Sequence, residues 1–271
     1  MIAAVGQFEA GTDVSANLEA CVELVDQAAA RGAELIVLPE LSMYFPLDTG
    51  DVFSAVAEPL DGRFVSTLGE RAAKHRMHVV AGFVESNPDG LPYNSVVSLD
   101  PNGKVIGTNH KTHLVDAFGV RESAGITPAT TAQPFVGKMG ELSLGAFVCY
   151  DLRFPETARR LVDAGAEVMA VPAAWISGYG KEDQFATLIK ARAIENVSYI
   201  LAANQIGPVQ SGYSMIVDPF GVVLASGGES FGVATADISA ARLNAVRGKV
   251  PALQHRRFDI IPTAAAARSL D

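Results

Sequence analysis

Cysteine is scarce in this sequence. Only two cysteines, Cys21 and Cys149, occur among 271 residues, and neither belongs to a CxxC motif. Such a chain cannot form the disulfide framework of a small secreted protein, and it lacks the paired cysteines from which structural zinc sites are built. We therefore expect a fold that a hydrophobic core holds together without disulfides or a metal ion.

Positive charge is also in short supply. The chain has 21 Lys and Arg against 30 Asp and Glu, a formal net charge of −9, and no basic run is longer than the Arg256-Arg257 pair. Proteins that bind nucleic acid neutralise phosphates with clustered Lys and Arg side chains. Nucleic acid is therefore not an expected partner.

Long apolar runs are missing as well. The N-terminus has no Lys or Arg before Arg31 and turns polar at Gln7, so it lacks the charged and apolar regions of a signal peptide. Nowhere do about 18 apolar residues follow one another, as a membrane-spanning helix requires. We expect a soluble, cytoplasmic protein with no membrane partner.

The hydrophobic content nevertheless supports a large core. Hydrophobic residues make up 49% of the chain and charged residues only 19%, which is far from the composition of a disordered protein. No low-complexity linker divides the sequence. We predict a single domain at residues 1–262, followed by a flexible tail at 263–271.

The first half alternates strands and helices. Leu18, Val22, Val25 and Ala29 recur at helical spacing, which predicts a helix that begins near an N-cap at Ser15. A second predicted helix turns Phe64 and Leu68 inward. The elements expected here are strands at 2–8, 34–39 and 78–85, helices at 15–31 and 61–77, and a hairpin around the Pro-Asn-Gly turn at 101–103.

The second half repeats this alternation. We expect strands at 141–148, 167–172, 198–204 and 232–238, helices at 155–164 and 182–197, a hairpin at 214–225 and a short helix ending near 247. Strand-helix units mixed with hairpins favour two packed, mixed sheets over one all-parallel sheet. The predicted class is α/β.

Cys149 is a candidate nucleophile because of its place in the chain. It follows a predicted strand and precedes a turn into a helix, where backbone N–H groups can stabilise an oxyanion. A buried, inert cysteine is the commoner situation and stays an alternative for Cys149. Cys21, in the middle of a predicted helix, is interpreted as structural.

A cysteine nucleophile usually takes a histidine as its base. None of the five histidines lies in a setting that marks a catalytic base; they are His75, His78, His110, His113 and His255. The His110–His113 spacing is similar to that of a metal-binding pair, but no third ligand accompanies it, so we expect no zinc. A cysteine protease is disfavoured for the same lack of a catalytic histidine.

Two other residues could assist the cysteine. Glu40 follows the apolar run 35–39, where a partly desolvated carboxylate can act as a general base. Lys111 follows the predicted hairpin, where its ammonium could stabilise an oxyanion. A solvated strand-end charge and a surface lysine are the alternatives for these two residues.

Together these positions carry a family resemblance. The segments LPE at 38–40, HKTHL at 110–114 and GAFVCYDLRFPE at 145–156 resemble the Glu-Lys-Cys blocks of the nitrilase superfamily of carbon-nitrogen hydrolases. Further blocks at 192–207, 214–225 and 247–259 extend the resemblance over nearly the whole chain. It implies a four-layer α-β-β-α sandwich that assembles into a homodimer or higher homo-oligomer and uses no cofactor.

The resemblance also implies roles for individual residues. Glu40 would be the general base, Lys111 the oxyanion stabiliser and Cys149 the nucleophile, and the Tyr150 backbone N–H would complete the oxyanion hole. Glu122 corresponds to a fourth residue that orients the lysine and the substrate. Two departures from the family pattern, Ala129 in place of glycine and Asn109-His110 before the lysine, put the shape of the substrate loop in question.

The residues after the cysteine indicate the branch and the substrate. CYDLRFPE at 149–156 resembles the branch with ω-amidase and deaminated glutathione amidase, which implies hydrolysis of a terminal amide through a thioester. Arg153 would bind a substrate carboxylate, or else form a structural ion pair with Asp151 or Glu156. Tyr44 and Trp175 are further substrate-binding candidates. Nitrile or N-carbamoyl amino acid hydrolysis, and a catalytically silent binding protein, remain alternatives.

Overall fold

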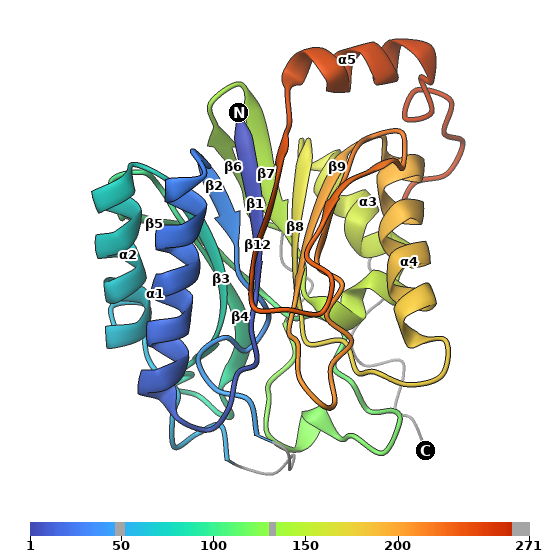
Figure 1. The fold of residues 1–271 in the computed structure, drawn as a ribbon. Helices are drawn as coiled ribbons and strands as arrows, with labels where there is room; N and C mark the ends of the chain where they lie inside the picture. The colour runs from blue at the N-terminus through green and yellow to red at the C-terminus, as the bar shows by residue number, and fades with distance from the viewer. Residues whose placement is uncertain (47–51, 130–133, 262–271) are drawn as a thin grey trace.

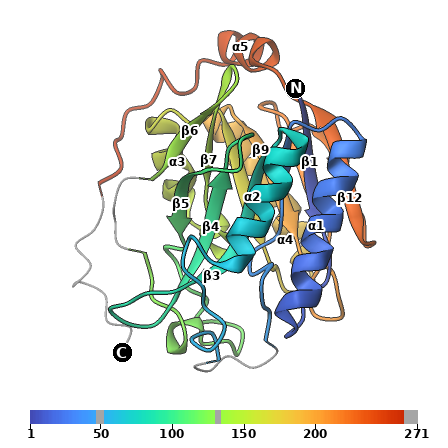
Figure 2. The same ribbon diagram turned by 90° about the vertical axis from the view of Figure 1, so that its left-hand side faces the viewer.

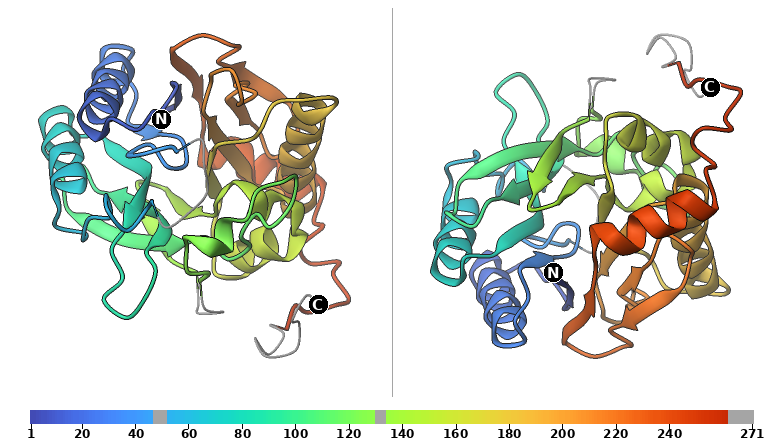
Figure 3. Two further views of the ribbon diagram at one scale, coloured as in Figure 1. Left: turned by 90° about the horizontal axis from the view of Figure 1, so that it is seen from below. Right: turned by 90° about the horizontal axis from the view of Figure 1, so that it is seen from above.

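Two six-stranded sheets face each other at the centre of the molecule, and helices cover the outer face of each sheet (Figure 1). The structure is a computed structural model that describes residues 1–46, 52–129 and 134–261. The layers run helix, sheet, sheet, helix, which confirms the predicted α-β-β-α sandwich, and Figure 3 shows these layers from both ends. The tail predicted at 263–271 lies outside the described residues.

The first sheet mixes parallel and antiparallel neighbours. Strands β1, β2 and β3 are parallel, while β4, β5 and β12 join through antiparallel pairs. Helices α1 and α2 lie side by side over this sheet (Figure 2). The elements of this half are β12 (Gly232–Asp237), β1 (Ile2–Gln7), β2 (Leu35–Val37), β3 (His78–Glu85), β4 (Tyr93–Leu99) and β5 (Val105–His110) in spatial order, with α1 (Val14–Ala30) and α2 (Arg63–His75).

The second sheet has the same plan. Strands β7, β8 and β9 are parallel, and β6, β10 and β11 extend the sheet by antiparallel pairs. Helix α5 (Ala240–Lys249) lies across one end of the sandwich, at the top of Figure 1. The remaining elements are β11 (Val223–Ser226), β10 (Met215–Val217), β9 (Tyr199–Asn204), β8 (Val168–Ala173), β7 (Leu142–Ala146) and β6 (Val136–Met139), with α3 (Pro155–Asp163) and α4 (Lys181–Asn196) outside.

Strand periodicity divides the core into two parts. Successive side chains of a strand point to opposite faces, so Leu35 and Val37 pack between the sheets while Ile36 and Leu38 pack under α1 and α2. Strand β2 is buried on both faces for this reason, which explains its continuous apolar run.

Helix α1 differs in detail from the prediction. Its N-cap is Asp13, not Ser15, because the Asp13 carboxylate accepts hydrogen bonds from the backbone N–H groups of Ser15 and Ala16. Its buried face runs through Leu18, Cys21, Leu24, Val25 and Ala28, whereas Val22 and Ala29 are only half-buried. Cys21 therefore lies at the centre of the buried face, and burial raises its pKa to about 12.

Other predicted elements are confirmed with shifted ends. Phe64 and Leu68 are fully buried in α2, as expected. The strand predicted at 141–148 ends at Ala146, because the chain turns there into the short 3₁₀ helix η2 (Cys149–Arg153). Within the described residues, no helix combines the length and apolarity needed to cross a bilayer.

Candidate active site

The candidate catalytic residues meet at one end of the sandwich. Glu40 follows β2, Lys111 follows β5, and Cys149 follows β7 at the start of η2. Strand β5 is antiparallel to β4, which is antiparallel to β3, so β5 points the same way as β2 and β3. The first sheet therefore delivers Glu40 and Lys111, and the second delivers Cys149, to a common place.

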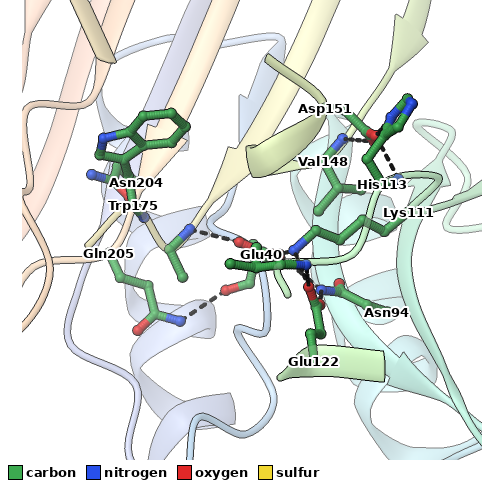
Figure 4. A network of polar contacts seen from close by, with 12 residues as sticks. Glu40, Asn94, Lys111, His113, Glu122, Val148, Asp151, Trp175, Asn204 and Gln205 are labelled. Carbon is green, nitrogen blue, oxygen red and sulfur yellow. Dashed lines mark hydrogen bonds and ion pairs between the residues drawn. The ribbon is translucent and has the colours of Figure 1, made fainter. Parts of the chain in front are cut away.

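Lys111 is held between two carboxylates. Its Nζ lies 2.7 Å from Glu40 Oε1 and 2.8 Å from Glu122 Oε2 (Figure 4). All three side chains are buried. Burial alone would lower the pKa of Lys111, but the carboxylates of Glu122 and Glu40 outweigh it and raise the pKa well above its usual value. The two carboxylates therefore favour the charged ammonium and hold it in place.

Asn94, a residue the sequence analysis missed, joins the same two carboxylates. Its Nδ2 donates to Glu40 Oε1 at 2.8 Å and to Glu122 Oε1 at 2.9 Å. The backbone N–H of Val115 donates to Glu122 Oε2, and that of Ala174 to Glu40 Oε2, each at 2.8 Å. Every carboxylate oxygen of the pair is thus hydrogen-bonded, which fixes both side chains.

The backbone around Glu40 leaves no free space. A Cβ at Gly82 of β3 would lie 2.6 Å from both the Glu40 Cα and the Pro39 carbonyl oxygen. The Gln205 side chain donates to the Glu40 carbonyl at 2.8 Å, and Leu41 has a φ of +50°. Glycine is required at position 82 because no side chain fits between β3 and the Glu40 segment.

Cys149 occupies a strained turn. Its φ of +42° lies in the left-handed region, which a non-glycine residue adopts only when its surroundings impose it. Burial raises the pKa of the thiol, and the negative charge of Glu40 raises it further, while the charge of Lys111 lowers it. The net direction is well above the usual value, so the resting side chain is a neutral thiol.

A cavity of about 230 Å³ opens beside these residues. Most of its lining is apolar, and the charged groups converge on it from both sheets. Its charged lining residues are Glu40, Glu122, Lys111, Arg153 and Lys181, and its large apolar ones are Phe45, Phe53, Val115, Phe118, Val120, Trp175, Ile176 and Val209. This composition suits a small substrate that has polar groups at its ends and an apolar middle.

Arg153 lies in the cavity wall, as the sequence analysis proposed for a substrate-binding residue. Its guanidinium carbon is 4.7 Å from the Trp175 ring centroid and 5.6 Å from that of Phe118. One Nη2 hydrogen bond goes to Gln184 at 3.0 Å, and the buried Nε has no partner among the described residues. The predicted alternative, an ion pair with Asp151 or Glu156, is absent from the described part of the chain.

Lys181 is a second cation at the cavity that sequence reasoning missed. Its Nζ lies 3.3 Å from the Phe118 ring centroid. Desolvation lowers the pKa of this ammonium, and the neighbouring charge of Arg153 lowers it further. An anion bound between the two cations would relieve their repulsion.

The remaining predicted binding residues separate into two groups. Tyr150 and Trp175 line the cavity, and the Trp175 backbone N–H is held by Asn204 at 2.7 Å. Tyr44 is not among the lining residues; it packs edge-on against Phe53, with ring centroids 6.2 Å apart. Tyr44 therefore contacts a residue of the cavity lining, Phe53, without lining the cavity itself.

The two histidines near Lys111 point to different partners. His110 Nε2 lies 2.9 Å from Glu85, and His113 Nδ1 lies 2.6 Å from Asp151. Within residues 1–46, 52–129 and 134–261, no cluster of three or more His, Cys, Asp or Glu side chains is placed to hold a metal ion. The two histidines thus contact two different carboxylates.

The four-layer sandwich brings a thiol, an ammonium and two carboxylates to one cavity. A model of the family described as carbon-nitrogen hydrolase matches residues 2–248. The chain therefore belongs to the carbon-nitrogen hydrolase family, as the sequence motifs indicated.

Known relatives indicate which type of reaction the chain catalyses. The chain is 34% identical to a deaminated glutathione amidase of Escherichia coli O157:H7 over 95% of its own length and 98% of that protein. A carbon-nitrogen hydrolase structure from Helicobacter pylori superposes with a TM-score of 0.87 at 26% identity, covering 95% of each chain. These similarities confirm a hydrolase of the amidase type that acts on non-peptide carbon–nitrogen bonds.

One solved structure bears on the cysteine. It is a Glu-to-Gln variant of the amidase from Nesterenkonia sp., described as showing covalent addition of the acetamide moiety of fluoroacetamide at the active site cysteine. The chain is 28% identical to it, with a TM-score of 0.79 and coverage of 95% of this chain and 94% of that one.

Proposed function

We propose that this protein is an amidase that cleaves a terminal amide of a small carboxylate-bearing substrate into carboxylate and ammonia through a thioester on Cys149. The observation that carries the proposal is the convergence of Cys149 and Glu40 on one cavity, with Lys111 fixed between Glu40 and Glu122. The modified cysteine of the Nesterenkonia amidase supports the nucleophile.

The protons can be followed through each step. Glu40 removes the thiol proton as Cys149 attacks the amide carbon, and the oxyanion forms near Lys111 Nζ and the Tyr150 backbone N–H. Glu40 then gives that proton to the leaving nitrogen, so ammonia departs and the thioester remains. Water, deprotonated by Glu40, hydrolyses the thioester, and the proton returns to the thiol as the product leaves.

Glu122 has a different task from Glu40. It accepts hydrogen bonds from Lys111, Asn94 and the Val115 backbone and so keeps Lys111 charged and oriented. The two carboxylates outnumber the lysine, and a single ammonium cannot neutralise both. Arg153 and Lys181 bring the charge of the cavity lining to three positive and two negative groups.

We assign the substrate carboxylate to Arg153 and Lys181, the two cations of the cavity lining other than Lys111. The Arg153 Nε is unused, and the charged groups of Arg153 and Lys181 both lie near the Phe118 and Trp175 rings. A carboxylate there completes charge-assisted hydrogen bonds. The relative named deaminated glutathione amidase acts on an amide that bears carboxylates, which supports an anionic substrate, and a 2-oxo dicarboxylate monoamide is our candidate of this kind.

The test combines turnover with mass spectrometry. Incubation with a 2-oxo dicarboxylate monoamide should release ammonia, and rapid acid quenching should leave an acyl adduct on the peptide that contains Cys149. Cys149→Ala should abolish both signals. Ammonia release without any adduct, or turnover that survives Cys149→Ala, contradicts the thioester route.

Assembly and location are part of the same proposal. The family resemblance implies a homodimer or higher homo-oligomer in the cytoplasm. Sedimentation equilibrium should give at least twice the 28.4 kDa of one chain. A monomer at micromolar concentration contradicts the assembly, and fractionation of cells that produce the protein tests its location.

A further inference from the structure

One buried carboxylate connects the two chain segments that carry Lys111 and Cys149. Asp151 Oδ1 accepts the His113 backbone N–H at 2.9 Å and lies 2.6 Å from His113 Nδ1. Its Oδ2 accepts the Val148 backbone N–H at 3.1 Å. Figure 4 shows these contacts beside Lys111. His113 is two residues after Lys111, and Asp151 is two residues after Cys149.

The His113 ring is itself held in place. It stacks on Phe154 with ring centroids 3.6 Å apart and planes inclined by 6°. Because both Asp151 oxygens accept backbone hydrogen bonds, we assign the hydrogen of the Asp151–His113 side-chain contact to Nδ1. The aromatic contact and the hydrogen bond together fix both the direction and the plane of the imidazole.

Neither residue lines the catalytic cavity, so neither can touch a substrate bound there. Both act on the residues that do. The Asp151–Val148 hydrogen bond supports the strand end just before Cys149, whose φ of +42° needs external support. The Asp151–His113 hydrogen bonds attach this turn to the segment after Lys111.

We infer that His113 and Asp151 form a positioning pair that sets the distance between the Cys149 thiol and the Lys111 ammonium. This inference rests on the proposed function, in which the thiol attacks a carbonyl whose oxygen must develop its charge next to Lys111. Glu40 already fixes Lys111 within the first sheet, but Cys149 arrives on the second sheet. The His113–Asp151 pair is a side-chain connection between their two segments.

Three substitutions separate the contributions of the pair. His113→Asn keeps a donor near the position of Nδ1 but loses the stacked ring. His113→Phe keeps a ring for stacking on Phe154 but loses the hydrogen bond. Asp151→Asn replaces one acceptor oxygen with a donor, so an N–H of His113 or Val148 faces another donor.

A positioning role predicts a specific kinetic pattern. Misplacing reacting groups by about 1 Å costs on the order of 100-fold in rate. We expect His113→Phe and Asp151→Asn to lower kcat by on the order of 100-fold with KM changed less than about 3-fold, since the cavity is intact. His113→Asn should recover most of kcat, because the donor is restored.

Active-site counting distinguishes positioning from loss of folded protein. Alkylation with iodoacetamide, followed by intact-mass analysis, gives the number of reactive Cys149 thiols per chain, with Cys149→Ala as the control for Cys21. The positioning variants should retain about one reactive thiol per chain and a low kcat at each site. A purely structural pair would instead give fewer reactive thiols, each with the wild-type kcat.

The neighbouring contact between His110 and Glu85 offers a matched control. His110 bonds Glu85 at 2.9 Å and stacks on Tyr93, but these contacts stay within the first sheet. His110→Phe should therefore leave kcat within about 3-fold of wild type. A His110→Phe loss equal to that of His113→Phe overturns the inference.

The failures of the two claims differ. A wild-type protein that releases no ammonia from any terminal amide refutes the proposed function. A wild-type protein that is active, accompanied by His113→Phe and Asp151→Asn variants with unchanged kcat per reactive thiol, refutes only the positioning pair.

Discussion

Arg153 gives the sharpest test of substrate charge. Its guanidinium has five N–H donors, of which one is used by Gln184, and it lies over the Trp175 ring where water is partly excluded. A hydrogen bond to a charged group contributes about 1.5 to 3 kcal/mol. Arg153→Gln should therefore lower kcat/KM for a monoamide of a dicarboxylate by about 10- to 150-fold, since about 1.4 kcal/mol corresponds to a factor of ten.

The comparison substrate is a neutral amide of similar size, such as the methyl ester of the same compound. It lacks the charge that Arg153 is proposed to bind, so its kcat/KM should change less than about 3-fold. Arg153→Lys keeps the charge but loses the planar pair of donors, and an intermediate loss is expected for the anionic substrate only. The assay is ammonia release with both substrates for each variant.

Lys181→Met completes the series. The ammonium lines the cavity and is half-buried. With an effective dielectric constant of about 40 and a separation of about 6 Å, its attraction for the substrate carboxylate is about 1.4 kcal/mol, or about 10-fold in kcat/KM. Equal losses on the anionic and the neutral substrate for both Arg153→Gln and Lys181→Met would refute the assignment of these residues to the carboxylate.

Three further predictions follow from the packing and charge of the site. Gly82→Ala must displace the Glu40 backbone, so kcat should fall on the order of 100-fold, whereas Gly248→Ala, whose Cβ meets nothing within 4 Å, should leave kcat unchanged. Asn94→Ala removes two hydrogen bonds to buried carboxylates, each worth about 1.5 to 3 kcal/mol, and urea unfolding should show the lost stability; an unchanged midpoint contradicts this. The pKa of the Cys149 thiol is raised above 9, its usual value, so above pH 9 the thiol ionises more readily in the unfolded chain than in the folded one. The stability that the thiol proton contributes below pH 9 is therefore lost above it. The free energy of unfolding of wild type relative to Cys149→Ala should fall between pH 8 and pH 10.5, and a constant difference refutes this prediction.

The order of elements was predictable because it follows from local pattern. Apolar runs bounded by turns predicted the strands except β6, and helical spacing predicted the helices, to within a few residues at each end. The predicted N-cap of α1, Ser15, was wrong. Asp13 and Ser15 are both good N-cap residues, and only the backbone conformation decides between them. The buried face of α1 was shifted because its packing partners, not its own spacing, set which side is covered.

Only those residues of the candidate site that lie in sequence motifs could be predicted. Glu40, Lys111, Cys149 and Glu122 lie in recognisable blocks, and the structure brings all four together. Asn94 lies near the start of β4, 17 residues before Lys111, and reaches the site through strand pairing that no local pattern reveals. Lys181 opens helix α4 and reaches the cavity only because the loop after β8 folds back over Trp175.

The order of strands in the first sheet determines how much of the chain must be synthesised before the enzyme can be active. All four candidate catalytic side chains have been translated by residue 149, but the edge of the first sheet beside β1 is filled only by β12 (Gly232–Asp237), near the other end of the chain. A nascent chain that stops before β12 leaves β1 unpaired on that side and the sheet that carries Glu40 and Lys111 incomplete. We therefore expect stalled or truncated chains to be chemically silent, so that ammonia release would report completion of the fold better than secondary-structure signals do.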